Sequence, residues 1–190
     1  MTYRSYRGVG AAPVWILITA NVLFYVLTFL FPQITYSLAL RPTSFVYQQW
    51  TLLTSMFLHG GWWHLFANML PLYFFGTYLI GLLGETKFLL LYFIGGLLGN
   101  VLMVLLAPLA PFSFALGASG AVFAFGGALV VMRPRLRVII FPLFIPIPLW
   151  VAVIAGMVLS FAPSIGWGAH LGGLLFGLAA GYYFRRWRRI

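Results

Sequence analysis

Ser119 lies in the run GASGA, residues 117–121, where a hydrophobic segment begins. A serine among small residues can let two helices approach closely, or its hydroxyl can act as a nucleophile. A nucleophilic serine needs a base within about 2.6–3.2 Å to take its proton. The polar side chains of His64, Asn68 and His170 lie near the beginnings of two other hydrophobic segments, so they are the candidates to assist Ser119.

The chain contains a single acidic residue, Glu85, and no aspartate. Paired carboxylates, a Ser-His-Asp triad and carboxylate sites for Mg²⁺ or Ca²⁺ all need acids that this chain lacks. Cysteine is also absent, which excludes disulfides, thiolate metal sites and cysteine nucleophiles. We therefore expect no metal and no other cofactor, and catalysis by Ser119 would have to use a serine–histidine dyad.

The composition predicts an all-α membrane protein with a single domain over residues 1–190. Hydrophobic residues make up 63% of the chain and charged residues 6%, whereas a soluble domain has about 25% charged residues. A span needs ~17–25 apolar residues. Six such segments are predicted, at residues 14–31, 63–83, 88–107, 116–132, 147–163 and 167–184. Prolines interrupt residues 138–146, which we expect to form a broken or interfacial approach to the fifth span.

The basic residues predict the orientation of these spans. With six spans, all but one of the eleven Lys and Arg residues fall on one side, and Arg41 alone falls on the other. By the positive-inside rule, both termini are then cytoplasmic. The net charge of +10 is therefore a topology signal with some attraction to anionic lipid, and not a nucleic-acid signal, which requires a soluble basic face. The external connection of residues 32–62 is rich in aromatic residues and is expected to lie in the membrane interface.

The even-numbered spans begin on the external side. His64, Asn68, Ser119 and His170 therefore all lie in the first or second turn of one of these spans. At 1.5 Å per residue, each lies within about 10 Å of the external edge. Ser119 and Phe123 have i, i+4 spacing, which places Phe123 beneath any group that contacts Ser119. Each polar residue also has a structural alternative, as a close helix contact, a cap or an interfacial side chain. Their common depth on three spans favours a functional site.

Small residues favour close packing of the fourth and sixth spans. Gly117 and Gly120 open the fourth span, and small residues that include Gly173 recur at four-residue spacing on the sixth. Such stripes let helix backbones approach closely. A short serine side chain needs this proximity to reach a histidine on another helix.

The chemistry that these residues could perform is acyl transfer. His170 would act as general base toward Ser119 and then as general acid toward the leaving amine. Without an acid to orient it, its ring would be held by packing on Phe123. The amide of Asn68, the ring N–H of His64 and the backbone N–H of Ser119 could stabilise the oxyanion.

These motifs resemble those of the rhomboid intramembrane serine proteases. The run GASG at 117–120 resembles the GxSG motif, LHGGWWHLFANM at 58–69 resembles HxxxxHxxxN, and GAHLGG at 168–173 resembles the histidine motif of the sixth span. The resemblance covers nearly the whole chain. It implies a six-span helical core with a water-filled cavity open to the outside, and cleavage of transmembrane substrates near their external ends.

The resemblance also implies roles residue by residue. Ser119 matches the nucleophile and His170 the base. His64 and Asn68 match the oxyanion donors. Gly173 matches the glycine that brings the sixth span against the fourth.

Glu85 matches a structural acid at the cytoplasmic end of the second span, whereas three other positions depart from the usual pattern. Trp50 is followed by Thr51 where the family often has arginine, which puts the usual contacts of this loop in question. The residue beneath the nucleophile is Phe123 and not tyrosine, so stacking is kept and a hydroxyl is lost. Ala67 precedes the oxyanion asparagine and is expected to widen the lateral access for substrate.

We therefore expect an intramembrane serine endopeptidase of the minimal prokaryotic form, in the cell (inner) membrane, acting on transmembrane proteins within the lipid. Substrate gating is expected around the fifth span or the first external loop. Oligomeric state and cleavage preference stay open. One alternative is a non-proteolytic rhomboid-like protein that binds or escorts membrane helices, a class marked by loss of Ser119 or His170. Another is a small transporter or channel, which the absence of intramembrane carboxylates disfavours.

Overall fold

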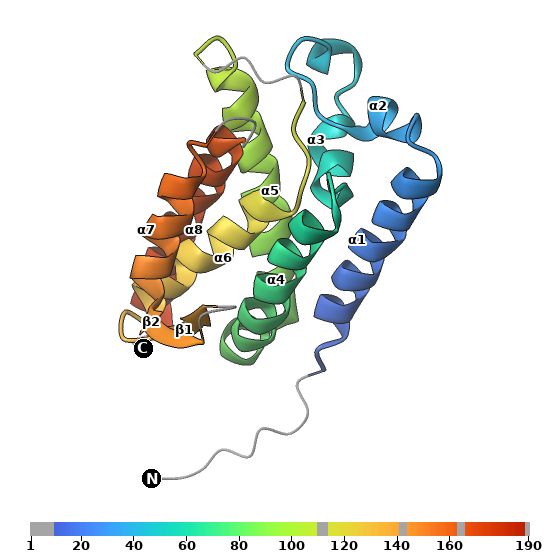
Figure 1. Cartoon of the computed structure of the whole chain (residues 1–190). Helices are drawn as coiled ribbons and strands as arrows, with labels where there is room; N and C mark the ends of the chain where they lie inside the picture. Colours follow the sequence, from blue (N-terminus) through green and yellow to red (C-terminus); the bar gives the residue numbers. More distant parts are fainter. Residues whose placement is uncertain (1–9, 110–113, 141–143, 163–165, 189–190) are drawn as a thin grey trace, which may run out of the picture.

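The computed structural model describes residues 10–109, 114–140, 144–162 and 166–188, which fold mainly into helices (Figure 1). The long elements form one bundle. They are α1 (Ala12–Leu30), α4 (Trp62–Leu83), α5 (Glu85–Leu106), α6 (Ser119–Met132), α7 (Leu149–Leu159) and α8 (Trp167–Arg188). Among the described residues, α1, α4 and α5 are long and apolar enough to cross a membrane.

Each predicted hydrophobic segment overlaps one of these helices. Figure 1 shows that α1 begins and α8 ends at the same end of the bundle. That all six helices cross a bilayer, with both termini in the cytoplasm, stays a prediction.

The helix in the fifth segment is shorter than predicted, since α7 covers only Leu149–Leu159. Pro148 is its N-cap, with φ −57° and ψ 138°, and the extended hairpin before it prevents an earlier start. At the other end, the N–H of Ser160 bonds to the carbonyls of Gly156 and Met157, which tightens the last turn. Part of the predicted end, at 163, lies outside the described residues.

A short β-hairpin corrects the expectation of an all-α chain. Strand β1 (Arg137–Ile140) pairs antiparallel with β2 (Ile145–Pro148), with Val138 opposite Ile147 and Ile139 opposite Pro146. The predicted broken approach at 138–146 is thus largely extended, apart from 141–143, which lie outside the described residues. β-Branched residues favour strands, and a two-stranded ribbon has edge positions that tolerate prolines without an N–H.

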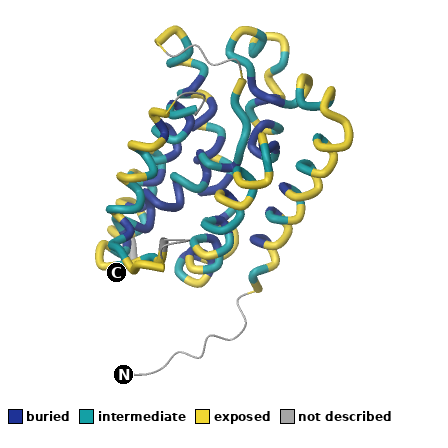
Figure 2. The backbone as a smooth tube through the Cα atoms, viewed as in Figure 1, coloured by how far each residue is buried: buried dark blue, intermediate teal, exposed yellow. Residues whose placement is uncertain are grey.

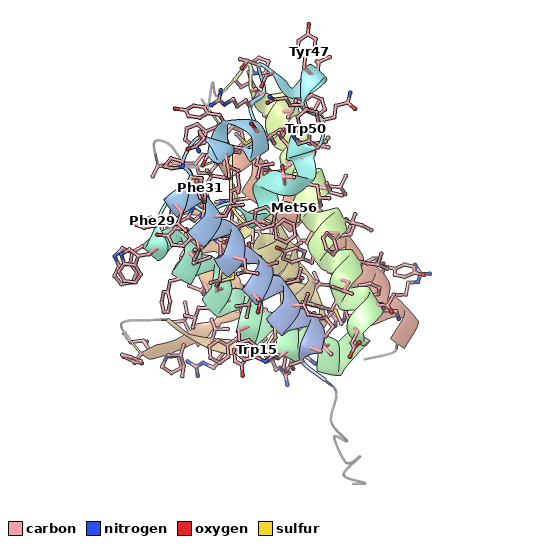
Figure 3. The ribbon with its side chains drawn as sticks, turned by 90° about the vertical axis from the view of Figure 1, so that its right-hand side faces the viewer. Trp15, Phe29, Phe31, Tyr47, Trp50 and Met56 are labelled. Atoms are coloured by element: carbon pink, nitrogen blue, oxygen red, sulfur yellow. The ribbon has the colours of Figure 1, made fainter. Side chains whose placement is uncertain are left out.

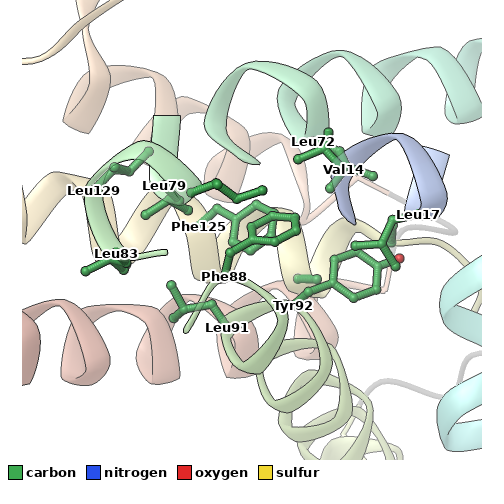
Figure 4. Packing of buried hydrophobic residues seen from close by; sticks show 14 of the residues in the cluster. Val14, Leu17, Leu72, Leu79, Leu83, Phe88, Leu91, Tyr92, Phe125 and Leu129 are labelled. Carbon is green, nitrogen blue, oxygen red and sulfur yellow. The ribbon is translucent and has the colours of Figure 1, made fainter. Parts of the chain in front are cut away.

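Helix α6 is the centre of the bundle. Nine of its 14 residues are buried, compared with four of 19 in α1. Figure 2 shows buried positions concentrated inside the bundle and exposed ones along the outer helices. The core places the Phe125 ring of α6 5.3 Å from Phe88 and 6.2 Å from Tyr92, measured between centroids (Figure 4). This aromatic cluster joins α6 to α5.

The outer face of α1 is apolar although it is exposed. Trp15 is 53% exposed and Phe29 72% exposed, at opposite ends of the helix (Figure 3). Large apolar side chains spread along a helix in this way suit lipid as the surrounding solvent.

Short helices cover one end of the bundle between α1 and α4. They are α2 (Ile34–Leu38), η1 (Phe45–Tyr47), α3 (Thr51–Thr54) and η2 (Ser55–Phe57). Figure 3 shows Tyr47 and Trp50 on this end, with Met56 nearer the core. Leu40 and Ala115 exchange two backbone hydrogen bonds of 3.0 and 2.7 Å. Because Ala115 lies just before α6, this bridge ties the covering segment to the start of that helix.

Helices α6 and α8 pack backbone against backbone. A Cβ atom added at any of three glycines of α8 would overlap a carbonyl group of α6. The glycines are Gly173, Gly177 and Gly181, and the carbonyls belong to Gly120, Ala124 and Ala128. The row of small residues that the sequence shows on the sixth span is therefore the surface on which α8 contacts α6.

A histidine, His59, is buried in the segment that leads into α4. His59 is 5% exposed, and neither of its ring nitrogens has a hydrogen-bond partner among the described residues. Burial, followed by repulsion from His64, lowers the pKa of His59 to about 3. The neutral ring is the form compatible with the folded state.

Replacing Gly173 by valine should destabilise the bundle, because the new side chain would collide with the Gly120 carbonyl and push α8 from α6. Overpacking of this kind costs about 1–3 kcal/mol. Thermal unfolding of the detergent-purified protein would measure it. Ala179→Val places the same side chain on an exposed position of α8 and is the matched control. Equal thermal midpoints for the two variants would contradict the packing described here.

His59 should make stability depend on pH. The unfolded imidazole takes up a proton as the pH falls below about 6.5, whereas the folded one does so only near 3. Stability is therefore full above pH 6.5 and is lost progressively as the pH falls. Thermal midpoints measured from pH 8 to pH 4.5 should decline less steeply in His59→Leu than in the parent. Parallel declines would show that His59 does not contribute.

Candidate active site

The turn before α6 requires glycine at position 117 for two reasons. Gly117 has φ +124°, a backbone conformation that side chains disfavour. A Cβ atom there would also lie 2.9 Å from both Cε1 and Nε2 of the His64 ring. The Gly117 N–H donates to the carbonyl of Ser55 at 2.9 Å. The turn is thereby fixed, and the His64 ring rests directly on it.

Ser119 is the first residue of α6. The chain reaches it from the covered end of the bundle, and α6 starts partway down, so Ser119 lies within the bundle (Figure 1). The first N–H groups of a helix have no partner inside the helix. The amides of Ser119, Gly120 and Ala121 therefore give this position a partial positive charge.

The structure brings Ser119 and His170 into hydrogen-bond contact. The distance from Ser119 Oγ to His170 Nε2 is 2.7 Å, although the residues are 51 positions apart and belong to α6 and α8. The Phe123 ring stacks on the His170 ring with centroids 4.6 Å apart and an angle of 21°. Phe123 lies one turn after Ser119, so one helix carries both the hydroxyl and the ring that supports its partner.

Ser160 contacts the opposite nitrogen of His170, and the sequence reasoning missed it. Its Oγ lies 2.5 Å from Nδ1 of His170, and its hydroxyl donates to the carbonyl of Gly156 at 2.8 Å. A hydroxyl has one proton. Because that proton is directed at Gly156, Ser160 accepts from Nδ1–H, and Nε2 presents a lone pair to Ser119. The hydrogen bonds thus favour the tautomer in which His170 can act as a base.

His64 and Asn68 lie on α4, one turn apart. The Gly60 N–H makes a weak hydrogen bond of 3.4 Å to Nδ1 of His64, which leaves the proton on Nε2. The Nε2 side of the ring rests on Gly117, beside the turn that holds Ser119. The amide of Asn68 donates one of its two protons to the His64 carbonyl at 2.8 Å. Its second N–H is not engaged by that bond.

A second layer of polar residues, also missed from the sequence, holds the turn in place. Asn100 on α5 donates to the Leu52 carbonyl at 2.7 Å and to the Ser55 hydroxyl at 3.0 Å. The backbone carbonyl of Ser55 in turn accepts a hydrogen bond from the Gly117 N–H. The available signal was Asn100 itself, a lone amide within an apolar segment, which is costly unless it is bonded.

The remaining predicted residues are near the site or distant from it. Gly120 packs closely against the backbone of Gly96 and Ala169. Glu85 is the first residue of α5, where a negative charge stabilises a helix. Glu85 is separated from His64 by the length of α4, which is about 30 Å. Among the described residues, no group of three or more His or acidic side chains could hold a metal ion.

An apolar groove of 830 Å³ lies between α4, the hairpin and α7. Ala67 and Phe74 line it from α4, Val138 from β1 and Ala152 from α7. Ala67 thus lines the groove, and its widening of the access for substrate stays a prediction. The groove borders the helix that carries His64 and Asn68.

Comparison with known proteins gives consistent matches. The rhomboid domain profile matches residues 46–187. The chain is 34% identical to "Rhomboid protein 1, mitochondrial" of Saccharomyces cerevisiae over 156 residues, which covers 77% of this chain and 45% of the relative. It is 35% identical to "Rhomboid protease GluP" of Bacillus subtilis over 132 residues, covering 69% of this chain and 25% of that protein.

A third relative is the "Presenilin-associated rhomboid-like protein, mitochondrial" of Rattus norvegicus, 33% identical over 67% of this chain and 36% of the relative. The chain thus spans less than half the length of these three proteins. The profile match, the relatives and the apolar helices agree: the chain is an integral, multi-pass membrane protein that belongs to the rhomboid family.

Proposed function

We propose that this protein is an intramembrane serine endopeptidase that uses Ser119 as nucleophile and His170 as general base. The observation that carries the proposal is the 2.7 Å contact from Ser119 Oγ to His170 Nε2. The hydrogen bonds of Ser160 favour the tautomer that leaves Nε2 free to accept a proton. The sequence relationship to "Rhomboid protease GluP" supports the same chemistry.

The first half of the reaction forms an acyl-enzyme. The Ser119 proton moves to Nε2 of His170 while Oγ bonds to the carbonyl carbon of the substrate. The carbonyl π electrons move to oxygen, giving a tetrahedral oxyanion. As it collapses, the C–N bond breaks and His170 returns the proton to the leaving amine. Water then repeats both steps on the ester and releases a carboxylic acid and free serine.

The oxyanion would be stabilised from two elements. The Ser119 backbone N–H at the start of α6 and the Nε2 of His64 both lie close to Gly117. The second amide N–H of Asn68 would add a donor from one turn further along α4. Loss of one such donor typically lowers the rate by ~10²–10³.

Ser160 is a positioning residue in this proposal. It orients the imidazole through Nδ1, the position that an aspartate takes in a Ser-His-Asp triad. A hydroxyl performs this task without a buried carboxylate, which would be costly in an apolar surrounding. Phe123 restricts the ring plane, so His170 keeps one orientation and one tautomer.

The apolar groove beside α4 is the proposed lateral access route for a transmembrane segment. Its length along α4 and its apolar walls suit a hydrophobic helix. The opposite side is formed mainly by Leu136 and strand β1, with Ala152 contributed by α7, which is only 11 residues long. We retain the predicted arrangement of six spans with cytoplasmic termini, in a prokaryotic inner membrane, because it places Ser119 toward the external side.

A fluorophosphonate probe should label the detergent-purified protein on Ser119. Ser119→Ala should abolish labelling because the nucleophile is gone. His170→Ala should lower the labelling rate by at least ~10²-fold because the general base is lost. In-gel fluorescence over time would measure both.

Val122→Ala changes a half-buried residue of α6 outside the proposed dyad and serves as the control for labelling. If the folded parent protein fails to label, or labels equally in Ser119→Ala, the non-proteolytic reading that binds or escorts helices gains support.

Ser160→Ala should lower kcat with little change in KM, because the hydroxyl acts on His170 and not on substrate. The loss of one buried hydrogen bond, ~1–3 kcal/mol, predicts a decrease of about 10–100-fold. Cleavage of a transmembrane peptide in liposomes would separate kcat from KM. Ser160→Thr keeps the hydroxyl and should retain most of the activity. Full kcat in Ser160→Ala would refute the positioning role.

A further inference from the structure

Three arginines converge on a second cavity, at the end of the bundle where α6 and α8 terminate. The cavity has a volume of 500 Å³. Arg133 and Arg135 line it from the turn between α6 and β1, and Arg185 lines it from α8. Met132, Pro134, Leu136 and Tyr78 form the rest of its wall. One turn and one helix, α8, thus direct positive charge to one place.

The chain provides no acidic side chain to balance these arginines. Its only acid, Glu85, lies beside Gly10 at the start of α1, and it does not line the cavity. Arg185 donates to the Val131 carbonyl at 3.2 Å, which restrains its guanidinium near the end of α6. Guanidinium groups match the planar oxygen pairs of phosphate and bind them bidentately. A bound phosphate would relieve the repulsion among the three cations.

The cavity adjoins the apolar groove. Tyr78 and Leu136 line both. From these residues the groove continues past Phe74 on α4 and Val138 on β1. A ligand that joins a phosphate to a long hydrocarbon chain matches a basic cavity that continues into an apolar groove. A free phosphate would use only the basic part, and an apolar helix only the groove.

We propose that this cavity binds the headgroup of an anionic phospholipid. The phosphate lies on Arg133, Arg135 and Arg185, and one acyl chain passes over Tyr78 and Leu136 into the groove. Basic sites between helices at a membrane surface recognise such headgroups by charge. This proposal does not require the proposed protease activity, and it assigns a function to arginines that the active site does not use. Its acyl chain would occupy the Tyr78 end of the groove that we propose as the access route for substrate.

The test uses the full chain in dodecylmaltoside micelles, titrated with dioleoylphosphatidylglycerol or dioleoylphosphatidylcholine. Thermal midpoints give the apparent affinity, and native mass spectrometry counts the retained lipid. Phosphatidylglycerol should raise the thermal midpoint and remain bound in the mass spectrum. Phosphatidylcholine should neither raise the midpoint nor remain bound. Arg133→Gln with Arg185→Gln should weaken the apparent affinity about 30-fold. Arg185→Gln alone supplies the comparison if the double variant does not fold.

Lys87→Gln with Arg186→Gln is the matched control, because this double variant also loses two positive charges but neither residue lines the cavity. This control should bind the lipid as the parent does. Equal weakening in both double variants would show diffuse surface attraction and overturn the site, as would equal binding of the choline lipid. Glycerol 3-phosphate should give no shift; a shift equal to that of the lipid would identify a site for soluble phosphate esters and overturn the lipid assignment.

Discussion

The direct backbone contact between α6 and α8 is the constraint on which the site depends. Ser119 has a side chain of two atoms beyond Cα, so it reaches His170 only if the two helices nearly touch. Gly173 makes this possible, because even one methyl group there would overlap the Gly120 carbonyl. In a bilayer, lipid chains compete for apolar surfaces, and helix association relies on such close packing. The same contact therefore supports both the fold and the 2.7 Å hydrogen bond of the site.

The scarcity of acids determines how the histidine is oriented. The only acid, Glu85, lies near the far end of α4 and is too distant to orient His170. The imidazole is held instead by neutral groups, the Ser160 hydroxyl at Nδ1 and the Phe123 ring on its face. Ser160 can act in this way because its own proton goes to the Gly156 carbonyl, at the end of α7. Ser160 follows the last residue of α7 in helical conformation, so the end of this helix positions the hydroxyl at His170.

The sequence supported most of the fold and the central pair of the site, because hydrophobic length and motif spacing are local signals. The family prediction is confirmed by the domain match. The roles of Ser119 and His170 stay a proposal that the geometry supports. Ser160, Ser55 and Asn100 were missed because their partners are distant in sequence. Serine and asparagine in apolar segments have many local uses, and only tertiary contacts distinguish them.

The hairpin was missed for a different reason. Residues 138–148 are apolar throughout, so their periodicity separates neither strand from helix nor span from interface. Pairing of Val138 with Ile147 depends on where the turn falls, which hydrophobicity does not specify.

Helix length connects the active site to the basic cavity. With 14 residues, α6 is about 21 Å long, shorter than the ~30 Å hydrocarbon core of a bilayer. Ser119 begins this helix and Arg133 follows its end. A helix that is too short to span leaves its N-terminus below the membrane surface, where hydrolysis needs water that the longer neighbouring helices would otherwise exclude. Its other end can then remain at the opposite headgroup level only if that end is held there. Under the two proposals made above, arginines bound to lipid phosphate would provide this anchor, and the short α6 would then hold Ser119 below the opposite membrane surface.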